Sequence, residues 1–442
     1  MTELAEAVQR LDVHLGARRR AAAPSPGWRG ELSSSALSTA TAMMALHGVD
    51  AAVHEERIQK GARWLLRTQN ADGGWGDTEV IRSNLSTTLL VWASLHRCAA
   101  AMSEAAQQRA ADWVRQRAGG SGPNEVAAAV VARYGKDRTF SVPILMHCTL
   151  GGILGEARSA WRRVLALPFE LAALPRAWFG RLSLPVVSYA LPALIAIGYA
   201  RFHQAPPAWW NPLRWLRAAL WPRIRPLLAE LQPSSGGYLE ATPLTSFVTM
   251  ALAAAGQKDH PCVAPAVAFL LASMRENPAD PDAGASWPID TDLATWATTL
   301  SIKAGVTLQE DEATAVRDWL LDQQYAEVHP FTMAAPGGWA WTELPGGVPD
   351  ADDTPGAMLA LHRLDADLPR VREAAARGAR WLLDLQNRDG GMPTFCRGWG
   401  TLPFDRSTPE LTAHALAAWW CWRASFDDDL RHRVDAATSR AL

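Results

Sequence analysis

The chain has 442 residues, of which 48% are hydrophobic and 20% are charged, and 43 Lys and Arg stand against 45 Asp and Glu. This length exceeds one ordinary hydrophobic core and predicts two or three, and the formal net charge of −2 excludes the broad cationic field that nucleic-acid binding needs. Twenty-one Trp against five Tyr indicates a need for large aromatic faces.

The N-terminal residues and the cysteines predict a protein of the reducing cytoplasm. Three arginines at positions 18–20 are followed by residues 21–30, which contain no apolar stretch, so we expect no cleaved secretory signal. The five cysteines are widely spaced and form no C-x-x-C pair, which argues against a disulfide framework and a structural zinc site. They are Cys98, Cys148, Cys262, Cys396 and Cys421.

Apolar residues recur at helical spacing along nearly the whole chain, which predicts an all-α fold. A repeat runs through residues 60–75 and returns at 377–392, with a weaker copy at 319–339. Each copy ends a helix on a Gln, continues through a Gly turn, and in two of the three reaches a Trp. The repeat therefore predicts helical hairpins whose second helices cover about 84–95, 355–361 and 408–420.

The residue types of the repeat suit a tight junction between helices. We expect the Gln side chain to satisfy the free carbonyls of its own helix end and the free amides of the next helix. Glycine permits the turn and a close approach, and the Trp ring is expected to pack over the junction.

Residues 158–231 interrupt the repeats. Apolar stretches there contain Pro168, Pro175, Pro185 and Pro192, and are too broken for a helix that spans a membrane. The stretch 205–223 then mixes Trp and Leu with Arg, a composition typical of a helix at a membrane surface. A Trp-rich packing helix between two domains is the alternative interpretation.

A cluster of carboxylates follows the weaker repeat. Asp350, Asp352 and Asp353 lie directly before an apolar helix and shortly after Trp339 and Trp341. The cluster is open to three interpretations: capping of the helix N-terminus, ligation of Ca²⁺ or Mg²⁺, and mutual perturbation of pKa values. In the third, crowded carboxyl groups cannot all ionise, and one stays protonated as a general acid.

These motifs and their order resemble those of squalene-hopene cyclase and the wider class II triterpene cyclases, from about residue 28 to the C-terminus. The resemblance rests on the Gln and Trp repeats, on the Asp-x-Asp-Asp-Thr string at 350–354, and on Thr412-Ala413-His414. It implies an all-α, α/α-toroid (double-ring helical barrel) architecture with two domains. We expect an N-terminal extension at 1–27, a toroid at 28–285 with a membrane-interface segment at about 160–231, and a partial catalytic toroid at 286–442.

The resemblance also assigns roles in the protonation of an alkene. Asp352 is expected to donate the proton, with Asp350 and Asp353 as flanking partners and His414 as the hydrogen-bond partner that raises its acidity. Glu410, one turn before His414, stands where the family usually has Asp.

Aromatic residues are expected to stabilise the carbocations that follow. Trp341 and Phe395 match positions of the family that line the cavity, although either could be plain core. The pair Asp290-Thr291 resembles a family pair, but its neighbour is Ile289 in place of Trp. Met392 replaces the Trp of the last repeat.

The implied substrate is squalene or a similar linear polyprenoid, with no cofactor and no metal. Since the family continues beyond the point that matches the last residue, the second ring is expected to be incomplete, and a homodimer or a separate chain would complete it. The implied location is the cytoplasmic surface of the membrane.

Two other functions stay open from the sequence. A diphosphate-bearing substrate would require Mg²⁺ and a basic patch, for which Arg176, Arg181 and Arg201 are the candidates. A noncatalytic toroid scaffold or subunit is the second alternative. A protein prenyltransferase β-subunit is disfavoured, because no Cys closely follows the acidic motif to build its zinc site.

Overall fold

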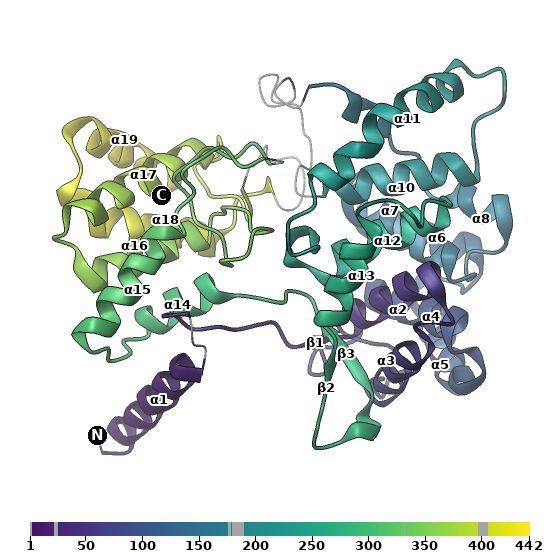
Figure 1. Cartoon of the computed structure of the whole chain (residues 1–442), viewed down its shortest axis with the longest axis horizontal. Helices are drawn as coiled ribbons and strands as arrows, with labels where there is room; N and C mark the ends of the chain where they lie inside the picture. The colour runs from purple at the N-terminus through teal and green to yellow at the C-terminus, as the bar shows by residue number, and fades with distance from the viewer. Residues whose placement is uncertain (1, 22–24, 176–177, 179–189, 331, 397–404) are drawn as a thin grey trace. The chain divides into compact units, whose positions relative to one another are not determined.

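The computed structural model describes residues 2–21, 25–175, 178, 190–330, 332–396 and 405–442 (Figure 1). It is mostly helical with one small sheet, and the all-α fold expected from the sequence is therefore confirmed. The chain folds into two compact units. We call the described residues from 32 to 291 the N-terminal unit, and those up to 31 together with those from 292 onward the C-terminal unit.

The N-terminal unit is built around five inner helices that contact one another in a closed cycle, each touching the next and the last touching the first. In the order of the cycle they are α2 (Ala36–Asp50), α4 (Leu85–Cys98), α7 (Arg138–Leu150), α10 (Leu191–Gln204) and α12 (Thr242–Ala254). The outer helices are α3 (Glu55–Arg67), α5 (Ala100–Ala118), α6 (Pro123–Tyr134), α8 (Ala157–Arg163), α11 (Pro212–Glu230) and α13 (Val263–Ala272). Two layers of helices in a closed ring form the expected toroid.

The residue patterns of the helices match their layers. The inner helix α12 is rich in Ala, Thr and large apolar residues and is buried on nearly all sides. The outer helix α3 buries Ile58, Trp64 and Leu65 on one face and turns its charged residues to the other. An apolar stripe on one side places a helix in the outer layer, and an apolar surface all round places it inside.

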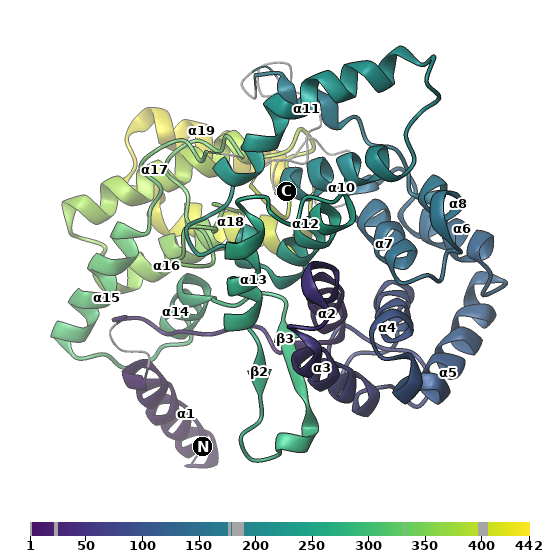
Figure 2. The same ribbon diagram turned by 45° about the vertical axis from the view of Figure 1, so that its right-hand side comes forward.

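A three-stranded antiparallel sheet lies in the N-terminal unit in the order β1 (Ser34–Ser35), β3 (Ala285–Pro288), β2 (Arg275–Glu276). Ser35 pairs with Trp287 and Arg275 pairs with Ser286. Figure 2 shows β2 and β3 extending from the helices as a hairpin, whose connection contains the short helix η3 (Pro281–Ala283). The strands thus join the start of the unit to its end.

Residues 160–231 contain the short helix η1 (Phe169–Ala173), α10 and α11. Trp221 of α11 stacks on Tyr199 of α10, with ring centroids 3.4 Å apart, whereas Trp209 and Trp210 in the preceding loop are 68% and 72% exposed. Some tryptophans of this segment therefore pack, and others face solvent. None of the described helices combines the length and the apolar character that crossing a bilayer requires.

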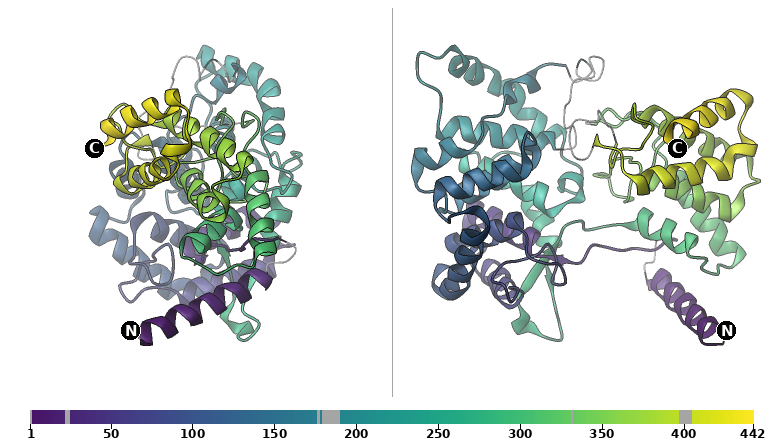
Figure 3. Two further views of the ribbon diagram at one scale, coloured as in Figure 1. Left: turned by 90° about the vertical axis from the view of Figure 1, so that its left-hand side faces the viewer. Right: turned by 180° about the vertical axis from the view of Figure 1, so that it is seen from behind.

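The C-terminal unit has three inner helices, α14 (Ala294–Lys303), α16 (Asp353–Asp365) and α18 (Pro409–Trp422), of which α16 contacts both others. The outer helices are α15 (Glu310–Asp322), α17 (Pro369–Leu385) and α19 (Asp428–Ala441), and the short helix η5 (Arg423–Ser425) follows α18. Figure 3 shows the last helices of this unit side by side. In the order α14, α16, α18 the inner helices form an arc.

The N-terminal helix α1 (Thr2–Ala21) belongs to the C-terminal unit. Asp12 accepts a hydrogen bond from the Thr307 amide at 2.7 Å, and the Trp28 amide donates to Thr298 Oγ1 at 2.8 Å. The segment expected as an N-terminal extension, 1–27, contacts this unit through Asp12. The boundary between the two units falls between residues 291 and 292, whereas the sequence predicts it between 285 and 286.

The repeated Gln holds the helices differently from our expectation. Gln324 Nε2 donates to the Gly337 carbonyl at 2.8 Å and to the Ala374 carbonyl of α17 at 2.9 Å, while Gln324 Oε1 accepts from Arg377 of α17. The expected bonds from free amides of the next helix are not among the bonds of this side chain within the described residues. An arginine one turn along the neighbouring outer helix saturates the Gln oxygen, and so the side chain joins the turn to that helix.

The same bonds recur in the other copies, at Gln69 with the carbonyls of Gly73 and Ala106 and at Gln386 with those of Gly390 and Ala437. Gln232 makes them as well, with the Gly236 and Cys262 carbonyls. This fourth copy was missed from the sequence because Tyr238 replaces the Trp, and its hydroxyl donates to the Leu228 carbonyl as an indole does elsewhere.

Each turn requires its glycine because the backbone of a neighbouring outer helix approaches it closely. Gly390 has a φ of +91°, and a Cβ there would stand 2.0 Å from the Arg440 carbonyl oxygen of α19. Gly236, with a φ of +85°, would meet the Pro265 carbonyl oxygen at 2.4 Å. Only glycine permits the outer helix to pack this closely on the turn.

Candidate active site

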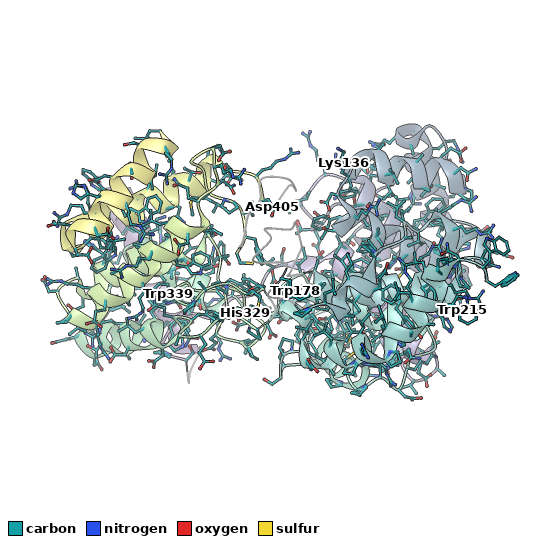
Figure 4. All side chains as sticks on the ribbon, turned by 90° about the horizontal axis from the view of Figure 1, so that it is seen from above. Lys136, Trp178, Trp215, His329, Trp339 and Asp405 are labelled. Atoms are coloured by element: carbon teal, nitrogen blue, oxygen red, sulfur yellow. The ribbon has the colours of Figure 1, made fainter. Side chains whose placement is uncertain are left out.

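The Gly-Gly-Trp turn of the repeat at 319–339 positions the acidic motif at the start of α16. Trp339 is fully buried in the C-terminal unit (Figure 4), and its indole donates to the Leu320 carbonyl at 2.7 Å. Its amide donates to Thr354 Oγ1 at 3.0 Å, and its carbonyl accepts from the Asp350 amide at 3.1 Å. These bonds on both sides of the motif fix the backbone from which the carboxylates project.

Asp350 caps this helix start. Asp350 Oδ1 accepts from the amides of Asp352 and Asp353, at 2.9 and 2.8 Å. Asp350 and Asp353 are both almost fully buried, with 4% and 3% exposed. Capping was one of the sequence interpretations, and the structure shows that one of the three carboxylates performs it.

The electrostatics separate the three carboxyl groups. Burial raises the pKa of Asp350, and burial together with the charges of Asp350 and Asp352 raises the pKa of Asp353 well above its ordinary value. In contrast, the hydrogen bond from His414 lowers the pKa of Asp352, although its partial burial opposes this shift. The buried pair therefore retains a proton at neutral pH, while Asp352 becomes the stronger acid of the three.

Asp352 lies between two side chains from the neighbouring inner helices. Asp352 Oδ1 is 3.1 Å from His414 Nδ1 of α18, and Asp352 Oδ2 accepts from Trp296 Nε1 of α14 at 3.2 Å. The Asp352 side chain is 43% exposed and that of His414 is 14% exposed. Both oxygens of a solvent-facing carboxylate are therefore held in place by ring nitrogens.

A cleft of about 750 Å³ opens in front of Asp352 and is lined, among the described residues, by α14, α16 and α18 together with Asp352 itself. Its apolar lining comes from Trp296, Leu300, Leu359, Leu411, Ala413 and Ala417. Its polar lining comes from Lys303, Asp352, His362, Arg363, Glu410, His414 and Cys421. The polar residues outnumber the apolar ones slightly, but most of the surface that the groove exposes is apolar, and such a groove with an acid on its wall can hold a hydrocarbon chain against a proton donor.

Glu410 lies in the same cleft without joining the hydrogen bonds of the acid. It is exposed in the first turn of α18, one turn before His414. His414 Nε2 is buried, and within the described residues it has no hydrogen-bond partner, Glu410 included. The structure therefore brings together Asp350, Asp352, Asp353 and His414, and places Glu410 beside them.

The two aromatic candidates contact each other and do not line this cleft. The ring centroids of Trp341 and Phe395 lie 5.8 Å apart with a tilt of 40°, and Trp341 is 9% exposed. The backbone carbonyl of Trp341 accepts from the Trp296 amide at 3.1 Å. Trp296 is thus the aromatic residue in contact with the acid, and it was missed from the sequence because no repeat or acidic motif marks it.

The Asp290-Thr291 pair lies in the N-terminal unit and does not line the cleft. Thr291 Oγ1 donates to the Glu240 carbonyl at 3.2 Å, and burial, with a contribution from the Glu240 charge, raises the pKa of Asp290 to about 7. Met392, at the position of the repeat Trp, is buried and keeps the backbone bond to Thr412 Oγ1 at 2.9 Å. Methionine has no indole N–H, so this copy lacks the hydrogen bond that the Trp indole donates to a helix carbonyl in the other copies that have a Trp.

No group of three or more His, Cys, Asp and Glu side chains is arranged to hold a metal ion within the described part of the chain. The three carboxylates of the motif have different surroundings: one caps a helix, one is buried beside it, and one faces the cleft. Arg176 and Arg181, two candidates for a phosphate-binding patch, lie outside the described residues, and Arg201 lies on α10 of the N-terminal unit.

Comparison with known proteins places these features in a family. The family model of the squalene-hopene cyclase N-terminal domain matches residues 16–145, and that of the squalene-hopene cyclase C-terminal domain matches residues 286–402. The two matched ranges together cover more than half of the chain. The squalene-hopene cyclase of Alicyclobacillus acidocaldarius is 24% identical over 88% of this chain and 63% of the relative. Enfumafungin synthase of Hormonema carpetanum is 24% identical over 98% of this chain and 36% of the relative.

The chain thus spans between about a third and two thirds of the length of these two relatives. Among solved structures, the type II terpene cyclase MstE from Scytonema is 17% identical over 92% of this chain and 86% of its own, with a TM-score of 0.19. The ent-copalyl diphosphate synthase from Streptomyces platensis is 14% identical over 98% of both chains, with a TM-score of 0.23. From the two family domains and the relatives, the chain belongs to the squalene-hopene cyclase family of class II terpene cyclases.

Proposed function

We propose that this chain is a terpene cyclase that protonates a terminal alkene of squalene or a similar linear polyprenoid and guides its cyclisation to a polycyclic, hopanoid-like product. The observation that carries the proposal is the Asp352 carboxyl on the wall of an apolar cleft, held by His414 and Trp296. An alkene is a feeble base, so its donor must be a strong acid. The lowered pKa of Asp352 makes its protonated form a stronger acid, and because the side chain is partly exposed, the carboxylate takes up this proton from solvent before each turnover.

The first step moves one proton. The O–H bond of protonated Asp352 breaks, and the π electron pair of the terminal alkene forms a C–H bond at its less substituted carbon. The more substituted carbon is left as a tertiary carbocation. The hydrogen bonds from His414 and Trp296 stabilise the Asp352 carboxylate that remains. Because Asp350 and Asp353 retain a proton between them, they add less negative charge beside the donor than two ionised groups would.

The positive charge then needs aromatic faces and no nucleophile. Trp296 lines the cleft, and its ring can attract a cation at about 0.5–1 kcal/mol while it is exposed and at about 2 kcal/mol once the substrate excludes water. We propose that Trp341 and Phe395, the aromatic pair of the same unit, stabilise charge at a later stage of the cascade. Loss of a proton, or addition of water, ends the reaction, so the cyclisation itself requires no redox cofactor.

A diphosphate-bearing substrate is the second candidate, and one observation favours it. Lys303 and Arg363 line the same cleft as Asp352, and Arg363 donates to the Lys303 carbonyl at 3.0 Å, which places two cations together. Such a pair could bind a diphosphate while the hydrocarbon reaches Asp352. With that substrate, Mg²⁺ would be expected to accompany the diphosphate.

We propose two further associations from the surface of the molecule. The exposed Trp209 and Trp210 suit peripheral attachment to the cytoplasmic face of a membrane, where a polyprenoid dissolves. The arc of inner helices exposes Trp296 and Leu300, at 37% and 39%, which a second copy or a separate chain would cover.

Conversion of squalene and of geranylgeranyl diphosphate by the purified chain tests the proposed function. Asp352→Asn keeps the shape of the side chain and removes its transferable proton, so turnover should fall at least about a hundredfold while the circular dichroism spectrum is unchanged. Cyclisation of squalene supports the first substrate, and cyclisation of the diphosphate alone supports the second. A folded Asp352→Asn variant with unchanged turnover would refute both, and a chain inactive on every polyprenoid would favour a noncatalytic scaffold.

A further inference from the structure

A pocket of about 310 Å³ in the N-terminal unit gathers four arginines away from the acidic cleft. Arg158 and Arg162 come from α8, Arg201 from α10 and Arg217 from α11. The rest of the lining is apolar or backbone: Ala166, Phe202, Ala205, Pro206, Pro207 and Ala208. Like charges repel at close range, so such a cluster calls for an anion that neutralises it.

Only one of these four charges is neutralised by a carboxylate within the described residues. Arg217 is 7% exposed and donates to both oxygens of Glu170, at 2.8 and 3.1 Å. Arg201 donates to the Val164 carbonyl at 3.0 Å and Arg158 to the Pro206 carbonyl at 3.0 Å. These carbonyls hold the side chains in place and leave their charges uncompensated.

The charges act on one another. The pKa of Arg201 is lowered by burial and by the charges of Arg162, Arg217 and Arg158, in that order. A bound anion would offset the repulsion between Arg201 and the other three arginines. The pocket is thus organised for an anionic ligand before the ligand arrives, which reduces the entropy lost on binding.

The sequence around the pocket is strongly basic. Residues 157–229 contain ten Arg, no Lys and one acidic residue, Glu170, in a chain whose formal net charge is −2. Arginine, with its planar fork of donors, suits phosphate oxygens better than Lys does. The charge of this segment therefore points to a phosphate-bearing partner.

Exposed aromatic and aliphatic side chains adjoin the pocket. The loop residues that line it, 205–208, lead directly into Trp209 and Trp210, which are 68% and 72% exposed. Trp215 and Leu216 on the first turns of α11 are 63% and 50% exposed, and Trp215 stands at the outer surface of its unit in Figure 4. The Trp215 indole donates to the Trp209 carbonyl at 2.9 Å, which ties the helix to the loop.

We propose that this arginine pocket binds the phosphate of an anionic phospholipid headgroup, while the adjoining tryptophans enter the same leaflet. The inference rests on the proposed membrane attachment and adds a defined headgroup site to it. Tryptophan is enriched at the membrane interface, and basic pockets bind lipid headgroups there, so exposed tryptophans beside an arginine pocket suit a bilayer surface. A soluble phosphate ligand would not require the exposed tryptophans.

Vesicle flotation tests the proposal with the full chain. The probes are phosphatidylcholine vesicles with and without one fifth phosphatidic acid. The pocket variant is Arg158→Ala/Arg162→Ala, since neither side chain bonds a carboxylate within the described residues and Arg162 makes no hydrogen bond there. The matched control is Arg223→Ala/Arg225→Ala, which removes the same charge from exposed positions of α11 outside the pocket.

The parent chain should bind the acidic vesicles more tightly than the neutral ones. The pocket variant should lose about thirtyfold in affinity for the acidic vesicles, as expected for two interfacial arginines, and the control variant no more than about threefold. Equal losses in the two variants would show diffuse electrostatic attraction and overturn the pocket. Equal binding of the parent to both vesicles would leave membrane attachment standing and refute the headgroup site.

A second measurement separates a lipid from a soluble ligand. Inorganic phosphate and glycerol 3-phosphate are added to the parent and to the pocket variant, and the melting temperature is followed. Little stabilisation of the parent by either is expected, because the apolar contacts are missing. Strong stabilisation of the parent that the pocket variant loses, together with no vesicle binding, would overturn the lipid assignment and identify a soluble phosphate site.

Discussion

Replacing Gln324 by Ala should destabilise the C-terminal unit through the loss of one side chain at the junction of two helices. Gln324 is 8% exposed, donates to two carbonyls at 2.8 and 2.9 Å, and accepts from Arg377. With about 1 kcal/mol for each neutral bond and about 1.5–3 kcal/mol for the charged one, the free energy of unfolding should fall by about 3–5 kcal/mol.

Gln386 provides a matched control in the same unit. It makes the same bonds, to the carbonyls of Gly390 and Ala437 at 2.7 and 2.9 Å and from Arg440, but it is only partly buried. Water can replace its bonds, so Gln386→Ala should cost about half as much as Gln324→Ala.

Urea denaturation followed by tryptophan fluorescence measures both variants. Midpoints should shift with little change in the m-value, because the surface exposed on unfolding hardly changes. A loss below about 1 kcal/mol for Gln324→Ala, or an equal loss for Gln386→Ala, would refute the view that the buried repeat Gln holds turn and outer helix together.

The other predictions concern the acid, its buried partner and the surface. Trp296→Phe keeps a ring in the cleft and removes the bond to Asp352, so turnover should fall roughly tenfold, measured as kcat/KM. Because the pKa of Asp353 is raised in the folded state, the unfolded chain releases this proton first as pH rises, and the contribution of Asp353 to stability should decrease from about pH 4 upward. In urea series at several pH values, the stability of the parent relative to Asp353→Asn should therefore fall as pH rises. Trp209→Ser/Trp210→Ser should reduce flotation on neutral vesicles, and unchanged flotation would count against membrane attachment. Light scattering should find a dimer or larger species if the arc of inner helices is covered by a second copy, and a stable monomer that cyclises a polyprenoid unaided would contradict this.

The sequence predicted the helices and junctions well because their residues act locally. The Gln, Gly and Trp of the repeats mark turns whose following helices begin at Leu85, Asp353 and Pro409. The partners of the Gln were predicted incorrectly, since its oxygen is bonded to an arginine some 50 residues away. Such a bond depends on the packing of a third helix, which a local pattern does not contain.

The sequence predicted the part of the candidate site that its motifs mark, and missed the part that depends on helix packing. The contact of Asp352 with His414 joins two positions that the motifs mark, whereas Trp296 carries no motif and reaches the acid only through the packing of α14 on α16. The opposite pKa shifts of Asp352 and its neighbours depend on burial, because Asp350 and Asp353 point into the unit and Asp352 into the cleft. Three aspartates within four residues of sequence do not reveal which of them will be buried.

Cyclisation in D₂O tests whether a proton from Asp352 starts the reaction. The carboxyl proton exchanges with solvent, so we predict one deuterium at the product carbon that was the less substituted carbon of the terminal alkene, and no product from Asp352→Asn. Mass spectrometry and deuterium NMR locate the label. A cyclised product without deuterium at that carbon, or an equally labelled product from the folded Asp352→Asn variant, would contradict protonation by this residue.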